Sequence, residues 1–281
     1  MKKLKEEIKD IFNNKTNLLL CFFVFLFLCG LLAEDIFIRQ KEKVVFCDVG
    51  QGDGAFINLG KEQVVIDGGP DNKFIGCIGK YMPYFDRKIE YMIISHPDKD
   101  HFVGAVEVLK RYNVEKVFIN GDESDIPEYI EFLKEAIDNI IIMDERSDIK
   151  FENGQIDFIY PSYKLQATSY KDSNDNSLVF RFEYNGKSIL FTGDISKKVE
   201  ESFLPRSDIC IKSDILKISH HGSKTASSEA FLGIMKPELA IISVGENNFG
   251  HPSYRVIKNL ERLGIEYKRT DEEGDIIINF Q

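Results

Sequence analysis

Cysteine is scarce in this sequence, with five residues among 281. Cys21 and Cys29 lie in an apolar segment near the N-terminus. The remaining residues form an odd set without the spacing of metal ligands, namely Cys47, Cys77 and Cys210. The pattern argues against a cysteine metal site and against a disulfide framework. We interpret the three as small buried side chains.

The sequence also lacks internal repeats, low-complexity linkers and an excess of positive charge. Its 281 residues, 43% of them hydrophobic, are sufficient for one sizeable core, and the missing linkers indicate one main domain. The formal net charge is −10, whereas proteins that bind polyanions normally show a basic stripe. Lys212, Lys217 and Lys224 offer a local basic patch at most, because acidic neighbours favour a mixed, solvated surface.

One long apolar run is present, at residues 18–33. Its 16 residues, extended by Ile36–Ile38, approach the roughly 17 to 25 that span a bilayer. Five lysines precede the run and three basic residues follow it closely, a bias that places the N-terminus in the cytoplasm. We predict a cytoplasmic segment at residues 1–17, an uncleaved single-pass membrane anchor at 18–38 and an extracytoplasmic domain at 43–281. A cleaved signal peptide is the main alternative.

Strand-like and helix-like segments follow one another after this run. The segments EKVVF, AFINL, EQVVID and IEYMIIS are short, β-branched and bounded by turn residues, a pattern typical of strands. Asn185-Gly186, between SLVFRFEY and KSILFTGD, predicts a two-residue hairpin turn. Two mixed sheets covered by helices would bury these segments.

Helical spacing appears in FVGAVEVLKRY, in PEYIEFLKEAI and in YRVIKNLERL. In the second of these, Ile130, Leu133 and Ile137 are expected to share the buried face. In the third, Ser253 precedes the helix as a cap and Gly264 follows its end. The helices therefore alternate with the strands along the whole domain.

The chain contains five histidines, and each follows a strand-like run or the short turn beyond one: His96, His101, His220, His221 and His251. None lies on a predicted helix face, where a core histidine would be the ordinary explanation. Strand ends in layered folds are rigid positions from which loops carry chemistry. Histidines gathered at such ends indicate a metal site.

The segment HPDKDH contains two of the five histidines together with two aspartates. A turn after a strand can direct His96 and Asp98 to one centre and Asp100 and His101 to a neighbouring one. Imidazole and carboxylate ligands together suit Zn or Mn. A solvated loop of turn-forming residues would explain the charges but not the two histidines.

The segment resembles the H-x-[HD]-x-D-H signature of the metallo-β-lactamase superfamily, and the blocks around it resemble the C-terminal domain of the ComEC competence proteins. The similar blocks follow the family's order over residues 44 to 276: DVGQGD, VVIDGG, ISHPDKDH, NDNSLVFRF, ILFTGD, DILKISHHGSKTASSE and IISVGENNFGHPS. The resemblance implies an α/β fold, a four-layer αββα sandwich with metals at one edge of its sheets. The predicted membrane helix would precede it.

The resemblance also implies one or two divalent metal ions, Zn or Mn. The implied ligands are His96, Asp98, Asp100, His101, Asp194 and His221. Asp194, in TGD, matches the carboxylate that bridges two metals. Either member of the HHG pair fits the remaining ligand position, and we favour His221 over His220.

The other matched positions would serve catalysis and substrate binding. Asp100, His220 and His251 form the implied catalytic set, with His220 or His251 protonating the leaving group. The implied substrate contacts are Asn176, Ser177, Ser223 and Lys224. For the last two, in SKTASS before a helix expected from Ser227, a helix-capping loop is an equal alternative. Asp67 would orient a ligand histidine, and Asp53 would line the site.

The sequence departs from the wider superfamily in two respects. No histidine lies between His101 and His220, where a third histidine ligand of the first metal is usual, so this position is ligand-poor. Asn176 and Ser177 stand in that region, as they do in the ComEC branch. Complete competence proteins also have many membrane spans, whereas this sequence has at most one.

The predicted function is a membrane-anchored metallohydrolase that cleaves phosphodiester bonds with a metal-activated water. The resemblance suggests competence and DNA uptake, with single-stranded DNA as a candidate substrate, and makes β-lactamase activity the weaker prediction. The acidic net charge favours small or membrane-linked phosphodiesters over processive cleavage of DNA. The alternatives are a lactonase or thioesterase and a non-enzymatic, membrane-anchored binding protein. The sequence identifies no protein partner.

Overall fold

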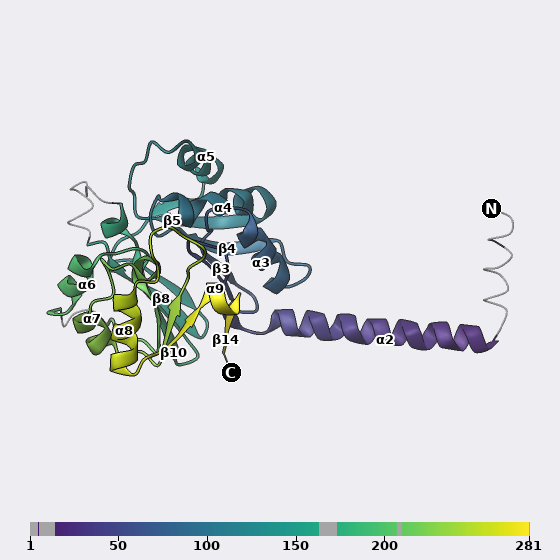
Figure 1. The fold of residues 1–281 in the computed structure, drawn as a ribbon. Helices are drawn as coiled ribbons and strands as arrows, with labels where there is room; N and C mark the ends of the chain where they lie inside the picture. The colour runs from purple at the N-terminus through teal and green to yellow at the C-terminus, as the bar shows by residue number, and fades with distance from the viewer. Residues whose placement is uncertain (1–4, 6–14, 163–172, 207–209, 281) are drawn as a thin grey trace.

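Two mixed sheets form the centre of the domain in the computed structural model, which describes Lys5 and residues 15–162, 173–206 and 210–280 (Figure 1). The first sheet has the order β14 (Ile276–Asn279), β1 (Lys43–Phe46), β2 (Gly54–Asn58), β3 (Gln63–Asp67), β4 (Lys88–Ile93), β5 (Asn113–Ile119) and β6 (Ile140–Ile142). The second has the order β13 (Glu266–Arg269), β12 (Leu239–Ile242), β11 (Ile215–Lys217), β10 (Lys187–Phe191), β9 (Val179–Tyr184), β8 (Gly154–Tyr160) and β7 (Asp148–Phe151).

Each sheet is antiparallel in one half and parallel in the other. Strands β3 to β6 pair in parallel, as do β10 to β13. The carboxyl ends of parallel strands meet at one edge of a sheet, so loops that follow them lie close together. This topology brings segments from distant parts of the sequence to one edge of the sandwich.

Helices cover the outer faces of both sheets. The first sheet carries α3 (Lys73–Tyr81), α4 (Lys99–Arg111) and α5 (Pro127–Ala136), and the second carries α6 (Lys197–Phe203), α7 (Glu229–Met235) and α8 (Tyr254–Leu263) (Figure 1). The short helices η1 (Asn174–Asn176), η2 (Ser219–Gly222) and α9 (Thr270–Glu273) lie in connections. A third apolar cluster, including stacked Phe46, Phe180 and Phe191, fills the space between the sheets. The predicted αββα sandwich is confirmed.

The local turn and cap chemistry acts as predicted. Asn185 and Gly186 both have positive φ and join β9 to β10 as a two-residue hairpin. The Ser253 side chain accepts a hydrogen bond from Val256 N–H at the start of α8, and Gly264 ends the helix with φ of 67°. These residues fix where the elements begin and end.

The predicted apolar face of α5 is correct only at Leu133, which is partly buried against the core. Ile130 and Ile137 are exposed, while Tyr129, Phe132 and Ala136 are buried. The aromatic pair packs against Phe102 of α4, with ring centroids 5.0 and 6.2 Å away. Aromatic side chains bury more apolar surface than isoleucine does, so they determine which face turns inward.

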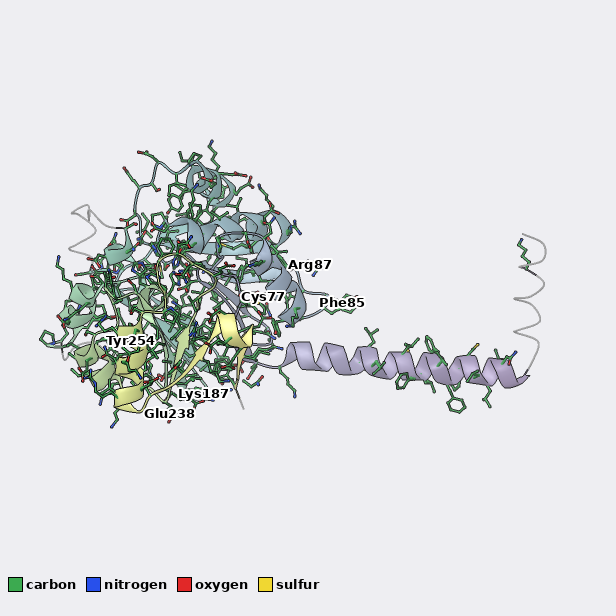
Figure 2. The ribbon with its side chains drawn as sticks, in the orientation of Figure 1. Cys77, Phe85, Arg87, Lys187, Glu238 and Tyr254 are labelled. Atoms are coloured by element: carbon green, nitrogen blue, oxygen red, sulfur yellow. A yellow bond between two sulfur atoms is a disulfide. The ribbon has the colours of Figure 1, made fainter. Side chains whose placement is uncertain are left out.

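The apolar N-terminal run forms most of helix α2 (Lys15–Gln40), which extends away from the sandwich (Figures 1 and 2). Its large apolar side chains between Leu18 and Leu32 are 47% to 66% exposed. Within the described part of the chain, however, no helix combines the length and apolarity needed to cross a bilayer. The predicted transmembrane helix is therefore not supported.

The prediction that the cysteines form no disulfide is wrong. Cys47, after β1, is bonded to Cys77 of α3, while Cys210 is exposed. The two bonded residues are buried, as small apolar side chains would be, and lie 30 positions apart. Their spacing in the sequence carries no signal, because α3 brings Cys77 back over the end of β1 only in the folded chain.

Replacing both bonded cysteines by serine is expected to destabilise the domain by about 3 kcal/mol, because the bridge restricts the unfolded chain. The difference in the free energy of unfolding is measured by urea unfolding of the oxidised protein and of the double variant. Reduction of the unmodified protein should produce a similar loss, and Cys210→Ser serves as the matched control. Equal stability of reduced and oxidised protein would contradict the prediction.

Candidate metal centre

The metal ligands suggested by the sequence come together at the edge where the parallel strands end. Asp98 and Asp100 lie after β4, Asp194 after β10, and His221 in η2 after β11. They therefore come from the connections that follow strands of both sheets, Asp100 from the first turn of α4, and the sandwich rather than any single segment assembles the site.

Four side chains form the tightest cluster: Asp100, His101, Asp194 and His221 each offer a ligand atom, and these atoms lie within 4.8 Å of one another. His221 Nε2 is 3.4 Å from Asp100 Oδ2 and 3.3 Å from Asp194 Oδ2. His101 Nε2 is 3.4 Å from Asp194 Oδ1. Asp194 thus lies between two histidines, in the position expected of a bridging carboxylate.

Three ligand atoms of this cluster are buried without hydrogen-bond partners among the described residues: Nε2 of His101, Nε2 of His221 and Asp194 Oδ1. Nε2 of the neighbouring His96 is in the same state. Buried polar atoms left unpaired are costly, and natural proteins rarely retain several at one point without a purpose. Imidazole nitrogens and carboxylate oxygens that converge on a common point fit a divalent cation, so the residues present fit the implied metal.

His96 and Asp98 lie beside this cluster. His96 Nε2 is 3.8 Å from Asp98 Oδ2, and its ring centroid is 4.1 Å from that of His101. Asp98 is more exposed, and its Oδ1 accepts a hydrogen bond from Ser173 Oγ at 2.7 Å. Among the described residues this second group has fewer converging donors than the first, in keeping with the missing histidine.

The α4 turn that carries Asp100 and His101 is locked to the loop after β3. Gly68 N–H donates to the His101 carbonyl at 2.5 Å, and Gly104 N–H donates to the Gly69 carbonyl at 3.0 Å. A Cβ atom on Gly104 would collide with the carbonyl oxygen of Gly68, and one on Gly68 would collide with the backbone nitrogen of Ala105. Gly104 of α4 and Gly68 of the DGG block therefore permit a close approach that a larger residue would prevent.

That contact places Asp67 behind His101. Asp67 Oδ2 is 2.9 Å from His101 Nδ1, and its carboxylate accepts bonds from the Ser95 N–H at 2.7 Å and hydroxyl at 2.9 Å. A carboxylate on the Nδ1 side fixes the ring orientation and leaves Nε2 free to bind a metal. Asp67 therefore contacts the His101 ring on the side away from the cluster, and its role in orienting a metal ligand stays a prediction.

Asn176 and Ser177 are buried rather than presented to a substrate. The Ser177 hydroxyl accepts from Asp194 N–H at 3.1 Å and lies 3.3 Å from His96 Nδ1. Asn176 donates to the Asp122 carboxylate, and its carbonyl accepts from Asn120. Both side chains support the loops behind the site, so direct contact with substrate stays a prediction.

The histidines in η2 are placed by an unusual backbone. His220 and His221 have φ of 51° and 52°, in the left-handed region that residues other than glycine rarely adopt. Such conformations cost about 1 to 3 kcal/mol each and persist only where the surrounding structure imposes them. The turn sends His221 into the buried cluster and leaves His220 partly exposed, with its Nε2 3.7 Å from Asp194 Oδ2.

His251 lies at the open side of the site. Its ring centroid is 5.5 Å from that of His220 and 6.5 Å from that of His221. Burial and then the two neighbouring histidines lower the pKa of His251 to about 4. His251 is therefore neutral at physiological pH and can donate one N–H bond.

The charges of the cluster are strongly coupled. Burial alone would lower the pKa of His101 and of His221, but Asp194 and the other carboxylates raise both well above 6.5. Burial alone would raise the pKa of Asp194, but His221 and His101 hold it well below its usual range. Burial and His101 lower the pKa of His96 to about 4. Without a metal, protons on two histidines thus balance the buried carboxylates.

The predicted phosphate-binding role of SKTASS loses its physical basis. The N–H groups of Ser227 and Ser228 donate to the buried Glu200 carboxylate at 2.6 and 3.0 Å. Ser228, not Ser227, caps α7 through its side chain. Ser223 is buried and its hydroxyl lies 2.9 Å from that of Thr225, whereas Lys224 is exposed. The helix-capping alternative describes this loop.

Lys217 is not part of a basic surface patch. It is 2% exposed, and its Nζ lies 2.6 Å from Asp53 Oδ2. Asp53 Oδ1 in turn lies 3.3 Å from His221 Nδ1. The only sequence signal for this position is the lysine inside the otherwise apolar DILKIS run, where an outward side chain is the ordinary expectation.

Fold and site together define the class: the chain belongs to the metallo-β-lactamase superfamily, whose family model matches residues 47–246. Solved proteins of this fold include a metallohydrolase of Ignicoccus hospitalis and a Zn²⁺-bound protein of Methylobacterium extorquens. Among solved structures, the chain is similar to the metallo-β-lactamase fold protein YhfI of Bacillus subtilis, with a TM-score of 0.57 at 14% identity, covering 85% of this chain and 100% of that one. This likeness shows the fold.

Within the superfamily the chain is related to competence proteins, as its sequence blocks predict. It is 29% identical over 264 residues to ComE operon protein 3 of Bacillus subtilis, covering 85% of this chain and 33% of that protein. It is 28% identical over 275 residues to Recombination protein 2 of Haemophilus influenzae, covering 95% of this chain and 33% of that protein. The chain therefore spans about a third of the length of these relatives.

Proposed function

We propose that this protein is a metal-dependent phosphodiesterase. The observation that carries the proposal is the convergence of half-buried Asp100 with buried His101, Asp194 and His221, whose ligand atoms lie within 4.8 Å of one another. A divalent ion bound there would act as a Lewis acid and would supply an activated water. Phosphodiesters suit such a centre because their hydrolysis needs a nucleophile and stabilisation of negative charge.

The chain's own residues would divide the remaining tasks. Asp67 and Asp53 orient His101 and His221, so that their Nε2 atoms face the common point. His251, neutral with its pKa at about 4, is suited to donate an N–H bond to a phosphate oxygen. His220, beside Asp194 and partly exposed, is the better placed to pass a proton to the leaving group.

The proposal is tested by cleavage of end-labelled single-stranded DNA and of bis(p-nitrophenyl) phosphate by the full chain with Mn or Zn. Asp100→Ala is the control for metal-dependent cleavage. Activity on both substrates supports the proposal, and activity on the small diester alone restricts it to small phosphodiesters. Hydrolysis of lactones or thioesters with no phosphodiester cleavage would replace it by the ester hydrolase alternative. Folded, metal-loaded protein without any of these activities would favour a binding protein.

An exposed aromatic ring beside the site supports nucleic acids among the substrates. Phe249 is 75% exposed, and its ring centroid is 5.7 Å from that of His251. Its loop is held by Asn247, whose side-chain oxygen accepts the N–H groups of Phe249 and His251 at 3.0 and 3.1 Å. A fixed, exposed ring next to a reaction centre can stack on a nucleobase.

Phe249→Ala is expected to raise the KM for an oligothymidylate about tenfold, since stacking on an aromatic ring contributes about 1 to 3 kcal/mol per base. The same change should leave the KM for an abasic oligonucleotide of equal length unaltered. Phe249→Tyr, which keeps the ring, should behave like the unmodified protein. Equal losses on both substrates would show a structural effect and contradict stacking.

We propose that the apolar segment of α2 attaches the protein to a membrane, with the domain on the extracytoplasmic side. The support is the row of exposed Leu and Phe side chains between Leu18 and Leu32, which are costly to leave in water. The Cys47–Cys77 disulfide adds support for the side, because such bonds persist in oxidising compartments.

Carbonate extraction of membranes and protease accessibility of intact cells test this attachment. The full chain should stay with the membrane and its domain should be cleaved from outside. A variant with four leucines of the segment replaced by serine should be released. Recovery of the unmodified chain in the soluble cytoplasmic fraction would reject the attachment without bearing on the catalytic proposal.

A further inference from the structure

A buried ion pair lies directly behind the proposed metal centre. Lys217, the last residue of β11, and Asp53, just before β2, are 2% and 6% exposed. The Lys217 ammonium lies 2.6 Å from Asp53 Oδ2 and donates to the Ile218 carbonyl at 2.9 Å. Lysine is almost never fully buried unless it is paired, so this position demands an explanation.

The pair stands between the apolar core and the site. Both residues line a small cavity of about 10 Å³ whose apolar wall includes Phe46, Phe180 and Phe191. Buried ion pairs are weak contributors to stability, because desolvation offsets their attraction, and apolar pairs of similar size often replace them without loss. Fold stability alone therefore does not account for a lysine at this point.

Asp53 is linked to the metal centre through both its backbone and its side chain. Its N–H donates to the Asp100 carbonyl at 3.1 Å, and its own carbonyl accepts from Gly69 at 2.7 Å. Its Oδ1 lies 3.3 Å from His221 Nδ1. That nitrogen also lies 2.9 Å from the Ser243 carbonyl, so two acceptors surround it. Such surroundings hold the proton on Nδ1 and direct Nε2 to the cluster.

We infer that Lys217 is a positioning residue: by holding the Asp53 carboxylate against His221, it fixes the orientation of that metal-binding imidazole. The inference rests on the proposed metal centre and deepens it. Without the ammonium, the Asp53 carboxylate would be a buried, unpaired charge, and it would turn away or admit water. The Ser243 carbonyl would then be the one remaining acceptor of these two beside His221 Nδ1.

The test compares metal binding in Lys217→Met and in the double variant Lys217→Met/Asp53→Leu. The double variant replaces the ion pair by an apolar pair, so it removes the unpaired charge together with the positioning contact. Lys212→Met, which changes an exposed lysine of the same segment, is the matched control. Affinity for Zn and Mn is measured by competition with a chromophoric chelator, and folding by thermal unfolding of the metal-free proteins.

Positioning predicts that Lys217→Met weakens metal binding about 10- to 100-fold, the usual loss when a group behind a ligand histidine is removed. The double variant should recover thermal stability yet bind metal as weakly as the single variant. Unchanged affinity in folded Lys217→Met would overturn the inference. So would a double variant that recovers both stability and affinity, because the lysine would then serve folding alone. If Lys217→Met does not fold, the metal affinity of the double variant is compared directly with that of the unmodified protein, and an unchanged affinity overturns the inference.

These readouts do not depend on catalysis. A protein whose metal affinity depends on Lys217 but that cleaves no phosphodiester would refute the proposed function and leave the positioning role intact. If the protein is a phosphodiesterase but its Lys217→Met variant binds metal normally, the positioning role is refuted and the proposed function stands. The two proposals therefore fail by different results.

Discussion

Asp194→Asn is expected to reduce kcat/KM for phosphodiester cleavage by about 10³-fold or more. The Asp194 carboxylate lies 3.3 and 3.4 Å from Nε2 of His221 and His101, so it contacts both histidines of the cluster. An amide of the same size is a poorer metal ligand and carries no charge. Since a metal ion contributes several kcal/mol of transition-state stabilisation, its loss or displacement accounts for a change of this size.

The same substitution should lower the amount of metal that the purified protein retains. Asp98→Asn is the comparison within the site, because Asp98 is 39% exposed and belongs to the group with fewer converging donors. Its expected loss is smaller and should be partly reversed by excess metal. Both variants are checked for thermal unfolding, since removing a buried charge next to two imidazolium groups alters stability as well. An Asp194→Asn variant that cleaves at the normal rate would refute the assignment of the centre.

The residues that form the centre were visible in the sequence because they stand in one short motif and in loops after predicted strands. HPDKDH, TGD and HHG each follow an apolar run, and parallel strands of a layered fold bring such ends together. The histidines at strand ends and the HPDKDH segment indicated a metal site, and the resemblance to the ComEC domain added Asp194 and the HHG pair as ligands. It left open which histidine of the pair turns inward, because that depends on the backbone of η2.

Groups that act from behind the site were harder to predict. The role of Lys217 becomes visible only through its contact with Asp53, which lies more than 150 positions earlier in the chain. Glu200 bonds the N–H groups of Ser227 and Ser228, so it occupies the helix start that seemed open to a phosphate. The disulfide likewise joins residues whose spacing follows no motif. Contacts between remote segments are properties of packing, which periodicity and motifs do not encode.

The affinity of the site for a metal is expected to rise steeply with pH. In the metal-free protein the pKa values of His101 and His221 lie well above 6.5, because Asp194 and neighbouring carboxylates outweigh the effect of burial. Metal ligation requires neutral imidazoles, so binding must release both protons. Two released protons correspond to an increase of up to about 100-fold in affinity for each pH unit between about pH 6 and 8. His96, with its pKa at about 4, is already neutral in this range and adds nothing to the slope.

The stability of the protein should change with pH in opposite senses with and without metal. A histidine whose pKa is raised in the folded state stabilises the fold below its unfolded pKa, and this contribution is lost as pH rises through the folded pKa. Metal-free protein should therefore lose stability towards alkaline pH, where the carboxylates around Asp194 are left unbalanced. Metal-loaded protein should gain stability towards alkaline pH, because tighter metal binding stabilises the folded state. The difference in Tm between the two forms should widen from about pH 6 to 8.

Calorimetric titration with Zn in buffers of different ionisation enthalpy counts the protons released, and thermal unfolding with and without chelator follows the gap in Tm. Replacement of His221 by Ala should remove about one proton from the count, because one of the two titrating imidazoles is gone. Affinity that is constant over the range would mean that both histidines are neutral before the metal arrives. In that case Lys217 would be the positive charge that the described residues place beside Asp53, since His221 would be neutral. The prediction that metal binding displaces protons from His101 and His221 would be refuted.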